Sequence, residues 1–231
     1  RIVTERTKMA MPETNIGLFP DVGGGFFLGR CPGRIGEYLA LTGNVIGAQD
    51  ALAAGLADVV LASKELPDLW GSLARLGADA LPAQVDADVA AAQSTLARSA
   101  AQIDHFFALD SVPAIVHTLE ADASDWARDT AKLLRQRSPL MLHVVLEQVR
   151  RGRAMGLADD LRMERDLVRH CFHLRPGAAG ETVEGIRALA VDKDHTPKWN
   201  PARIEDVTAD MVAPFFASPW PAHAHPLARL N

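Results

Sequence analysis

Residues 9–33 read MAMPETNIGLFPDVGGGFFLGRCPG, and this stretch decides the fold and the function that we expect. Two carboxylates, Glu13 and Asp21, stand eight residues apart on either side of the apolar segment 16–20. Glycines 23–25 follow and open a predicted helix, where a backbone without Cβ atoms can approach a ligand closely. Asp21 stands where the N-cap of that helix is expected. By spacing alone, Asp21 is more typical of a helix cap, and Glu13 of a turn, than either is of a catalytic group.

The glycine run does not satisfy the common nucleotide-binding motifs. No Lys-Ser or Lys-Thr pair follows it, as a P-loop requires, and the pattern GxGxxG is not met. The sequence also contains no GxSxG, so a serine nucleophile on a strand-to-helix elbow is not expected. These patterns exclude a nucleotide site and a serine hydrolase of that type.

Short apolar segments alternate with helical patterns over residues 1–61, a rhythm that is typical of a layered α/β domain. Gly43-Asn44 and Gly55 stand where helices are expected to end, because glycine readily adopts the left-handed conformation of a helix C-terminus. The apolar segments lie at 2–3, 9–11, 16–19 and 58–61, and the predicted helices at 22–31, 33–41 and 48–54.

Residues 62–213 are predicted to form a helical region. Met141, Val144, Val145 and Val149 fall on one helical face after Ser138-Pro139, a helix-start signal. The alanine-rich stretch 81–101 is expected to pack loosely on the surface or against another subunit. Residues 214–231 are too rich in proline for a helix, so we expect a flexible tail with His223 and His225 exposed.

Composition excludes several classes of protein. The net charge is -5 and the Lys and Arg residues are scattered, so nucleic acid is not an expected partner. The two cysteines, Cys31 and Cys171, are far apart, which indicates free thiols in a reducing compartment and a cytoplasmic location. No apolar run reaches the roughly 18 residues of a membrane span, so no membrane association is expected. The chain opens on Arg1 in what reads as a strand already in progress, so we expect an N-terminal portion to be absent.

A wider set of residues carries a family resemblance. They are Pro12-Glu13, Gly17, Pro20, the glycine run, Arg30, Gly33, Leu41-Thr42-Gly43, Ala48, Ala51 and Gly55-Leu56. This set resembles the crotonase (enoyl-CoA hydratase/isomerase) superfamily, and the strings AMPET and IGLFPDVGGG are similar to the 3-hydroxyisobutyryl-CoA hydrolases in particular. Position 21 discriminates, since the hydratases usually have glycine there and the hydrolases aspartate.

A second match lies near the C-terminus, in EGIRA at 184–188 and DKDHTPKW at 192–199. The resemblance therefore extends from Thr4 to about Pro201. One departure precedes it, because Glu181-Thr182 replace the Asp-Phe that is usual in the family, and we assign no ligand role to that loop.

The resemblance implies a crotonase-like α/β spiral of ββα units with a C-terminal α-helical region. Residues 1–61 would form the C-terminal part of the α/β core, and 181–201 the closing family segment. The implied reaction is hydrolysis of 3-hydroxyisobutyryl-CoA, or a close 3-hydroxyacyl-CoA, as in valine catabolism. Glu13 would act as nucleophile or as base for water, and Asp21 would bind the 3-hydroxyl of the substrate.

The resemblance also bears on cofactors and partners. No metal or redox cofactor is implied, and CoA enters as part of the acyl-CoA substrate. In the family the oxyanion-hole donors and the first adenine contacts come from segments upstream of Arg1, so activity is expected to need that N-terminal segment, as part of the protein or as a separate fragment. A homo-oligomer is also consistent with the family. The alternatives are an enoyl-CoA hydratase or isomerase, and an inactive fragment or assembly subunit.

Two further groups of side chains have more than one interpretation. Arg187, Lys193 and Lys198 could meet CoA phosphates, but a solvated face explains them equally well. His170 and His173 have a spacing that could bind a metal, although such a pair more often marks the C-terminal end of a helix.

Overall fold

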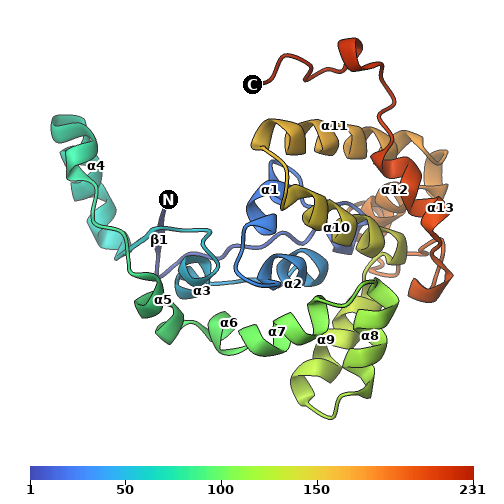
Figure 1. The fold of residues 1–231 in the computed structure, drawn as a ribbon, viewed down its shortest axis with the longest axis horizontal. Helices are drawn as coiled ribbons and strands as arrows, with labels where there is room; N and C mark the ends of the chain where they lie inside the picture. Colours follow the sequence, from blue (N-terminus) through green and yellow to red (C-terminus); the bar gives the residue numbers. More distant parts are fainter.

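The computed structural model describes the backbone of residues 1–231 and every side chain except those of residues 87, 88 and 178. Helices dominate the molecule (Figure 1). The strands β1 (Ile2–Thr4) and β2 (Val59–Leu61) pair in parallel, with Val3 opposite Val60. The chain is thus a mainly helical α/β structure with a small parallel sheet.

The first helices follow the sequence pattern. They are α1 (Gly24–Gly29), α2 (Ile35–Thr42) and α3 (Ala48–Ala53). Gly43 and Gly55, with φ of 67° and 69°, end α2 and α3 in the left-handed conformation, as predicted.

The apolar segments between them form less strand than the α/β rhythm suggests. Met9 makes one isolated bridge to Ile46, and residues 13–16 form the 3-10 turn η1 (Glu13–Ile16), which Gly17 ends with φ of 69°. The carbonyl groups of Glu13 and Thr14 in this turn accept the N–H groups of Leu18 and Ser138, so they are satisfied without a strand partner.

The remaining α-helices run from residue 66 to residue 212. They are α4 (Leu66–Leu76), α5 (Ala87–Gln93), α6 (Thr95–Arg98), α7 (Ala100–Phe107), α8 (Val112–Ala121), α9 (Asp125–Gln136), α10 (Pro139–Gly152), α11 (Leu157–His173), α12 (Glu181–Ile186) and α13 (Ala209–Val212). Short 3-10 turns connect them, at η2 (Ser63–Glu65), η3 (Gly77–Ala80), η4 (Gly177–Ala179), η6 (Ile204–Asp206), η7 (Ala213–Phe216) and η8 (Ala222–Ala224), and η5 (Arg187–Val191) is a π-helix. Among the described residues, none of these helices combines the length and the apolar character that crossing a membrane requires.

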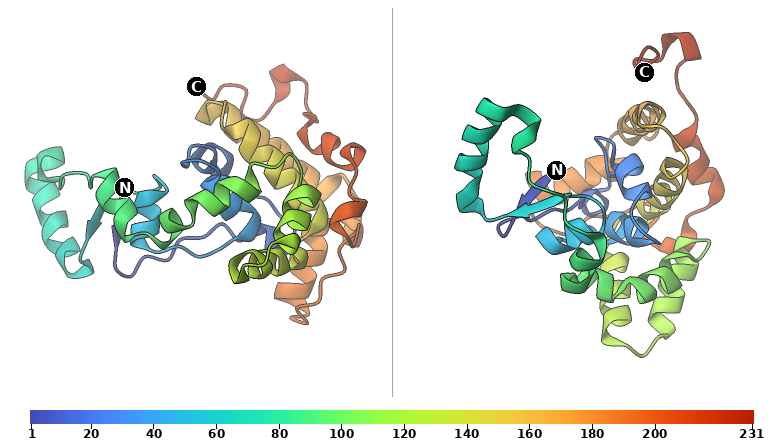
Figure 2. Two further views of the ribbon diagram at one scale, coloured as in Figure 1. Left: turned by 60° about the horizontal axis from the view of Figure 1, so that its bottom comes forward. Right: turned by 60° about the vertical axis from the view of Figure 1, so that its left-hand side comes forward.

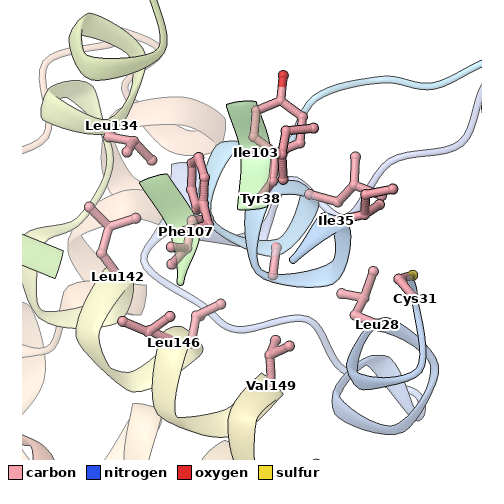
Figure 3. Close-up of a cluster of buried hydrophobic side chains, with 14 of the residues drawn as sticks. Leu28, Cys31, Ile35, Tyr38, Ile103, Phe107, Leu134, Leu142, Leu146 and Val149 are labelled. Atoms are coloured by element: carbon pink, nitrogen blue, oxygen red, sulfur yellow. The ribbon is translucent and has the colours of Figure 1, made fainter. Parts of the chain in front are cut away.

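Helix α10 is the centre of the core. Its predicted stripe, Met141, Val144, Val145 and Val149, is buried along its whole length. Figure 3 shows other side chains of this helix facing those of α1, α2 and α7. Because α10 packs directly on α1 and α2, the core fixes the elements that follow the two candidate carboxylates.

Ser138 both caps α10 and binds a buried acid. Its hydroxyl oxygen accepts the N–H of Met141 at 3.2 Å, and its O–H donates to the carboxylate of Glu181. We expect Ser138→Ala to lower the free energy of unfolding by about 2–4 kcal/mol, the sum of a lost cap and a lost bond to a buried carboxylate. Urea unfolding will measure this loss. Ser124→Ala, which removes a cap of α9 alone, serves as the control and should cost about 1 kcal/mol; equal losses would contradict the role of Glu181.

The alanine-rich stretch is packed more firmly than expected. Ala90, Ser94 and Leu96 are buried, and the carboxylate of Asp50 in α3 accepts bonds from the Ser94 hydroxyl (2.6 Å) and the Leu96 N–H (2.9 Å). By contrast, every side chain of α4 is at least partly exposed, Trp70 by 77%. Helix α4 stands out from the rest of the molecule (Figure 2).

The tail, residues 214–231, differs from the expectation at His225. This side chain is buried, with Nε2 3.2 Å from Oδ1 of Asp166 in α11. Its Nδ1 accepts the N–H of Leu227, so Nε2 is the donor to the carboxylate. The prediction of an exposed His225 is therefore wrong because α11 supplies a buried acceptor, whereas His223 is exposed as predicted. The flexibility of the tail stays a prediction.

Candidate active site

Glu13 is the first residue of η1 (Glu13–Ile16), and three elements hold the backbone of this turn and of Gly17, which ends it. The Thr14 hydroxyl donates to the Leu41 carbonyl at 3.2 Å, and the Ser138 N–H donates to the Thr14 carbonyl at 3.2 Å. From α12, the Thr182 hydroxyl donates to the Gly17 carbonyl at 2.6 Å. The turn that carries Glu13 is therefore fixed by α2, by the start of α10 and by α12.

Helix α12 touches η1 backbone to backbone. A Cβ atom on Gly185 would lie 2.2 Å from the Ile16 carbonyl oxygen, and one on Gly17 would lie 2.4 Å from the Glu181 carbonyl oxygen. Real Cβ atoms do not approach so closely, so only glycine at both positions permits this contact. Gly185, in the second sequence match, thus has a physical role: it allows the closing segment to pack against the Glu13 turn.

The Glu13 carboxylate lies in an environment that disfavours its charge. Its Oε2 atom is buried and accepts no hydrogen bond from the residues that the structure describes. Burial, with a smaller contribution from the charge of Asp21, raises the pKa of Glu13 from 4.5 to about 7. A carboxylate with such a pKa is a competent general base near neutral pH.

Asp21 does not cap α1, contrary to the interpretation that spacing favoured. The N-cap is Gly23, and the first amides of the helix bond elsewhere: the N–H groups of Gly23 and Gly25 donate to the carboxylate of Glu164 in α11, at 2.8 and 3.2 Å. Because another acid satisfies the helix terminus, the side chain of Asp21 can face the adjoining cavity instead.

The backbone after Asp21 is unusual. Val22 has φ of 54°, a left-handed conformation that β-branched residues rarely adopt, and Gly23 follows with φ of 87°. The Val22 side chain is 77% exposed. A conformation of this kind costs about 1–3 kcal/mol and persists only where the surroundings impose it. Here it reverses the chain between Asp21 and α1.

A cavity of about 250 Å³ adjoins this loop, and Asp21 lies on its wall. Most of the lining is apolar, with Arg1 and Asn44 as further polar groups. The apolar lining residues are Met9, Ala10, Met11, Val22, Gly24, Phe27, Leu28, Leu39, Ile46 and Leu56. Glu13 is not part of the lining, although its charge interacts with that of Asp21. A concave apolar surface with few polar groups is suited to a small acyl group.

The other candidates from the sequence contribute less. Arg187 forms ion pairs with Glu184, Asp192 and Asp194 at 2.6–2.8 Å, so its charge is neutralised within the closing segment. The Nε2 atom of His170 lies 2.7 Å from the carbonyl oxygen of Ala217 and is therefore engaged with the backbone. Neither observation favours a phosphate or a metal at these positions.

Sequence reasoning missed three residues behind the Asp21 loop: Gln148 in α10, and Asp160 and Glu164 in α11. All three side chains are buried. The sequence did carry a signal for two of them. Asp160 and Glu164 stand one helical turn apart, on the same helix face as Met163 and Leu167, which are also buried.

The sequence profile of the enoyl-CoA hydratase/isomerase family matches residues 1–216. The chain belongs to this family. A crystal structure of an enoyl-CoA hydratase from Rhodobacter sphaeroides superimposes with a TM-score of 0.83 at 36% identity, over 94% of this chain and 61% of that one. The crotonase-like α/β fold that the resemblance implied is thereby confirmed.

Two curated relatives illustrate that the chain resembles family members with different names. The mitochondrial 3-hydroxyisobutyryl-CoA hydrolase of Xenopus tropicalis is 37% identical over 227 residues, which are 94% of this chain and 58% of that protein. The small ribosomal subunit protein mS47 of Arabidopsis thaliana is 35% identical over 227 residues, 94% of this chain and 55% of that protein. The chain thus spans little more than half the length of the relatives that it matches.

Proposed function

We propose that this chain carries the working carboxylates of a thioester hydrolase that acts on 3-hydroxyisobutyryl-CoA or a close 3-hydroxyacyl-CoA. The observation that carries the proposal is the position of Asp21 on the wall of a mostly apolar cavity, together with Glu13, whose pKa burial and the charge of Asp21 raise to about 7. The relative from Xenopus tropicalis supports this substrate by its name. The proposed role in valine catabolism follows from the same substrate.

Glu13 is the proposed catalytic group. As a base, it takes a proton from water while the water oxygen attacks the thioester carbonyl carbon; as a nucleophile, it attacks that carbon itself and gives a mixed anhydride that water then hydrolyses. In either case the C–S bond breaks and CoA leaves as the thiolate, which takes up the proton from Glu13 in the first route or a proton from water in the second, and so becomes the free thiol. The clamped turn η1 supports both roles, because a held carboxylate loses little entropy on reaching the carbonyl.

Asp21 is the proposed binding group for the substrate hydroxyl. Its carboxylate on a mostly apolar wall is suited to accept a hydrogen bond from the 3-hydroxyl of the acyl group. We further propose that the oxyanion donors lie in a segment upstream of Arg1, as the resemblance implies, and that full activity requires it. Loss of one such donor typically costs about 10²–10³ in rate.

The pH dependence of the reaction follows from Glu13. Since the group must be ionised and its pKa is raised to about 7, thiol release should fall about tenfold per pH unit below that value and level off above it. Asp21→Asn removes a neighbouring negative charge, which should move the midpoint to lower pH. A pH–rate profile of both proteins tests this. A midpoint near 4.5 in the wild type, or one that Asp21→Asn leaves in place, would contradict the assignment.

Two alternatives remain as proposals of lower rank. A hydratase or isomerase is favoured by the likeness to the Rhodobacter sphaeroides enzyme, and a role in an assembly by the likeness to mS47. Thiol release from 3-hydroxyisobutyryl-CoA, measured beside hydration of crotonyl-CoA on a protein that includes the upstream segment, separates the three. Thiol release alone supports the hydrolase, hydration alone supports the hydratase, and neither activity supports an assembly role. The cytoplasmic location stays a prediction, since the Xenopus relative is named as mitochondrial.

A further inference from the structure

The loop that carries Asp21 is anchored from behind by a buried acid. The two carboxylate oxygens of Glu164 accept the N–H groups of Gly23 (2.8 Å) and Gly25 (3.2 Å), at the start of α1. Glu164 is only 4% exposed and comes from α11, 141 residues along the chain from Gly23. A bond between a charged or partly charged acceptor and a backbone N–H is among the stronger hydrogen bonds when buried.

The other flank of the loop is held by the same network. The Gln148 side-chain amide donates to the Pro20 carbonyl at 2.6 Å and lies 3.5 Å from Oε1 of Glu164. Pro20 and Gly23 enclose the short segment that holds Asp21, so both of its ends are bound to one buried polar cluster. The strained conformation of Val22 lies between these two anchors, which explains what imposes it.

Asp160 completes the cluster. It is fully buried, and a Cβ atom on Gly25 would lie 2.3 Å from its Oδ1. Burial raises the pKa of Asp160, and its interaction with Glu164 opposes that shift. Burial, together with the charge of Asp160, also raises the pKa of Glu164 to about 8. Two buried acids one helical turn apart are most stable when they share one proton. The positive charge of Arg30 also interacts with Asp160 and lowers the pKa of that carboxyl group.

We propose that Glu164, supported by Asp160 and Gln148, is a positioning residue that sets where Asp21 meets the substrate hydroxyl. The inference rests on the proposed function for its substrate, but its anchor bonds exist independently of any substrate. A merely structural role would affect all substrates alike. Positioning of Asp21 affects the 3-hydroxyacyl group alone, because only that group has a hydroxyl for Asp21 to bind.

The test compares two thioesters, 3-hydroxyisobutyryl-CoA and isobutyryl-CoA, which lacks the hydroxyl. In Glu164→Gln, the side-chain NH₂ cannot accept, so one of the two glycine amides loses its acceptor. We expect kcat/KM for 3-hydroxyisobutyryl-CoA to fall about 10- to 100-fold, and for isobutyryl-CoA about twofold or less. Asp159→Asn, on the exposed side of the same helix, is the matched control and should behave as the wild type.

The outcomes are distinguishable. Equal losses on both thioesters, or no loss on either, would overturn the positioning role. If the wild type releases thiol from neither thioester, the proposed function fails, and amide hydrogen exchange decides the inference instead. The glycine amide that loses its acceptor in Glu164→Gln, that of Gly23 or of Gly25, should exchange about tenfold faster at unchanged global stability, and unchanged exchange at both would overturn the inference. Should Glu164→Gln fail to fold, Gln148→Met, which removes the bond to the Pro20 carbonyl at the other end of the segment, replaces it in the comparison of the two thioesters, where the same selective loss is expected.

Discussion

Replacement of Glu13 by glutamine is expected to lower thioester hydrolysis by about 10²–10⁴-fold. The amide has nearly the shape of the carboxylate, but it can neither take a proton from water nor attack a carbonyl carbon. Free-thiol release from 3-hydroxyisobutyryl-CoA, with the mutant and wild-type proteins at pH 8, measures the effect. Full activity in Glu13→Gln would exclude the carboxylate from the chemistry.

The same substitution should not destabilise the protein, which separates chemistry from folding. The pKa of Glu13 is about 7 in the folded chain and 4.5 in its ordinary state. Between these two values the folded state holds a proton that the unfolded state has released, so the stability of the wild type falls as pH rises through that window. Glutamine does not ionise and escapes this loss. Urea unfolding at pH 8 should therefore find Glu13→Gln at least as stable as the wild type.

Gly185→Ala is expected to lower both the stability and the activity of the protein. The added methyl group would lie 2.2 Å from the carbonyl oxygen of Ile16, and its three nearest atoms all belong to the Ile16 backbone, so it has no flexible neighbour to displace. Overpacking of this kind costs about 1–3 kcal/mol. Because the contact is made by η1, the displacement should also reach Glu13 and lower thiol release. Urea unfolding and the thiol assay on one preparation measure both effects.

Gly71→Ala is the matched control for that experiment. Gly71 also lies inside a helix, but on the exposed α4, where a Cβ atom would meet only the far end of Arg75 at 3.6 Å. Alanine is the better helix former by about 1 kcal/mol, so this variant should be neutral or slightly more stable. If Gly185→Ala is equally harmless, α12 does not restrain the Glu13 turn.

Local sequence patterns predicted the helices α1, α2, α3 and α10. The stripe from Met141 to Val149 and the Ser138 cap mark α10 correctly, and Gly43 and Gly55 end helices as expected. Such features depend on neighbours three or four residues away, which the sequence displays directly. The tail was less predictable, because the acceptor for His225 is Asp166, 59 residues earlier.

The candidate site, too, was predictable in part, and the contacts between distant residues were the part that was missed. The carboxylates Glu13 and Asp21 could be chosen through the family resemblance, whereas spacing alone favoured a cap for Asp21. That interpretation failed because the acid that binds the helix start, Glu164, is 141 residues away from Gly23. A contact over that distance leaves no periodic pattern in the sequence, although a pair of acids on a buried helix face was a sign that some polar partner was required.

The contact between α12 and η1 also bears on the order in which the chain can fold. Thr182 and Gly17 are 165 residues apart, so the turn that carries Glu13 gains this bond only after those further residues have been synthesised. Closing so long a loop is slow compared with forming the helices within it. During synthesis, α1 and α2 can therefore form early, while the candidate site matures as one of the last events.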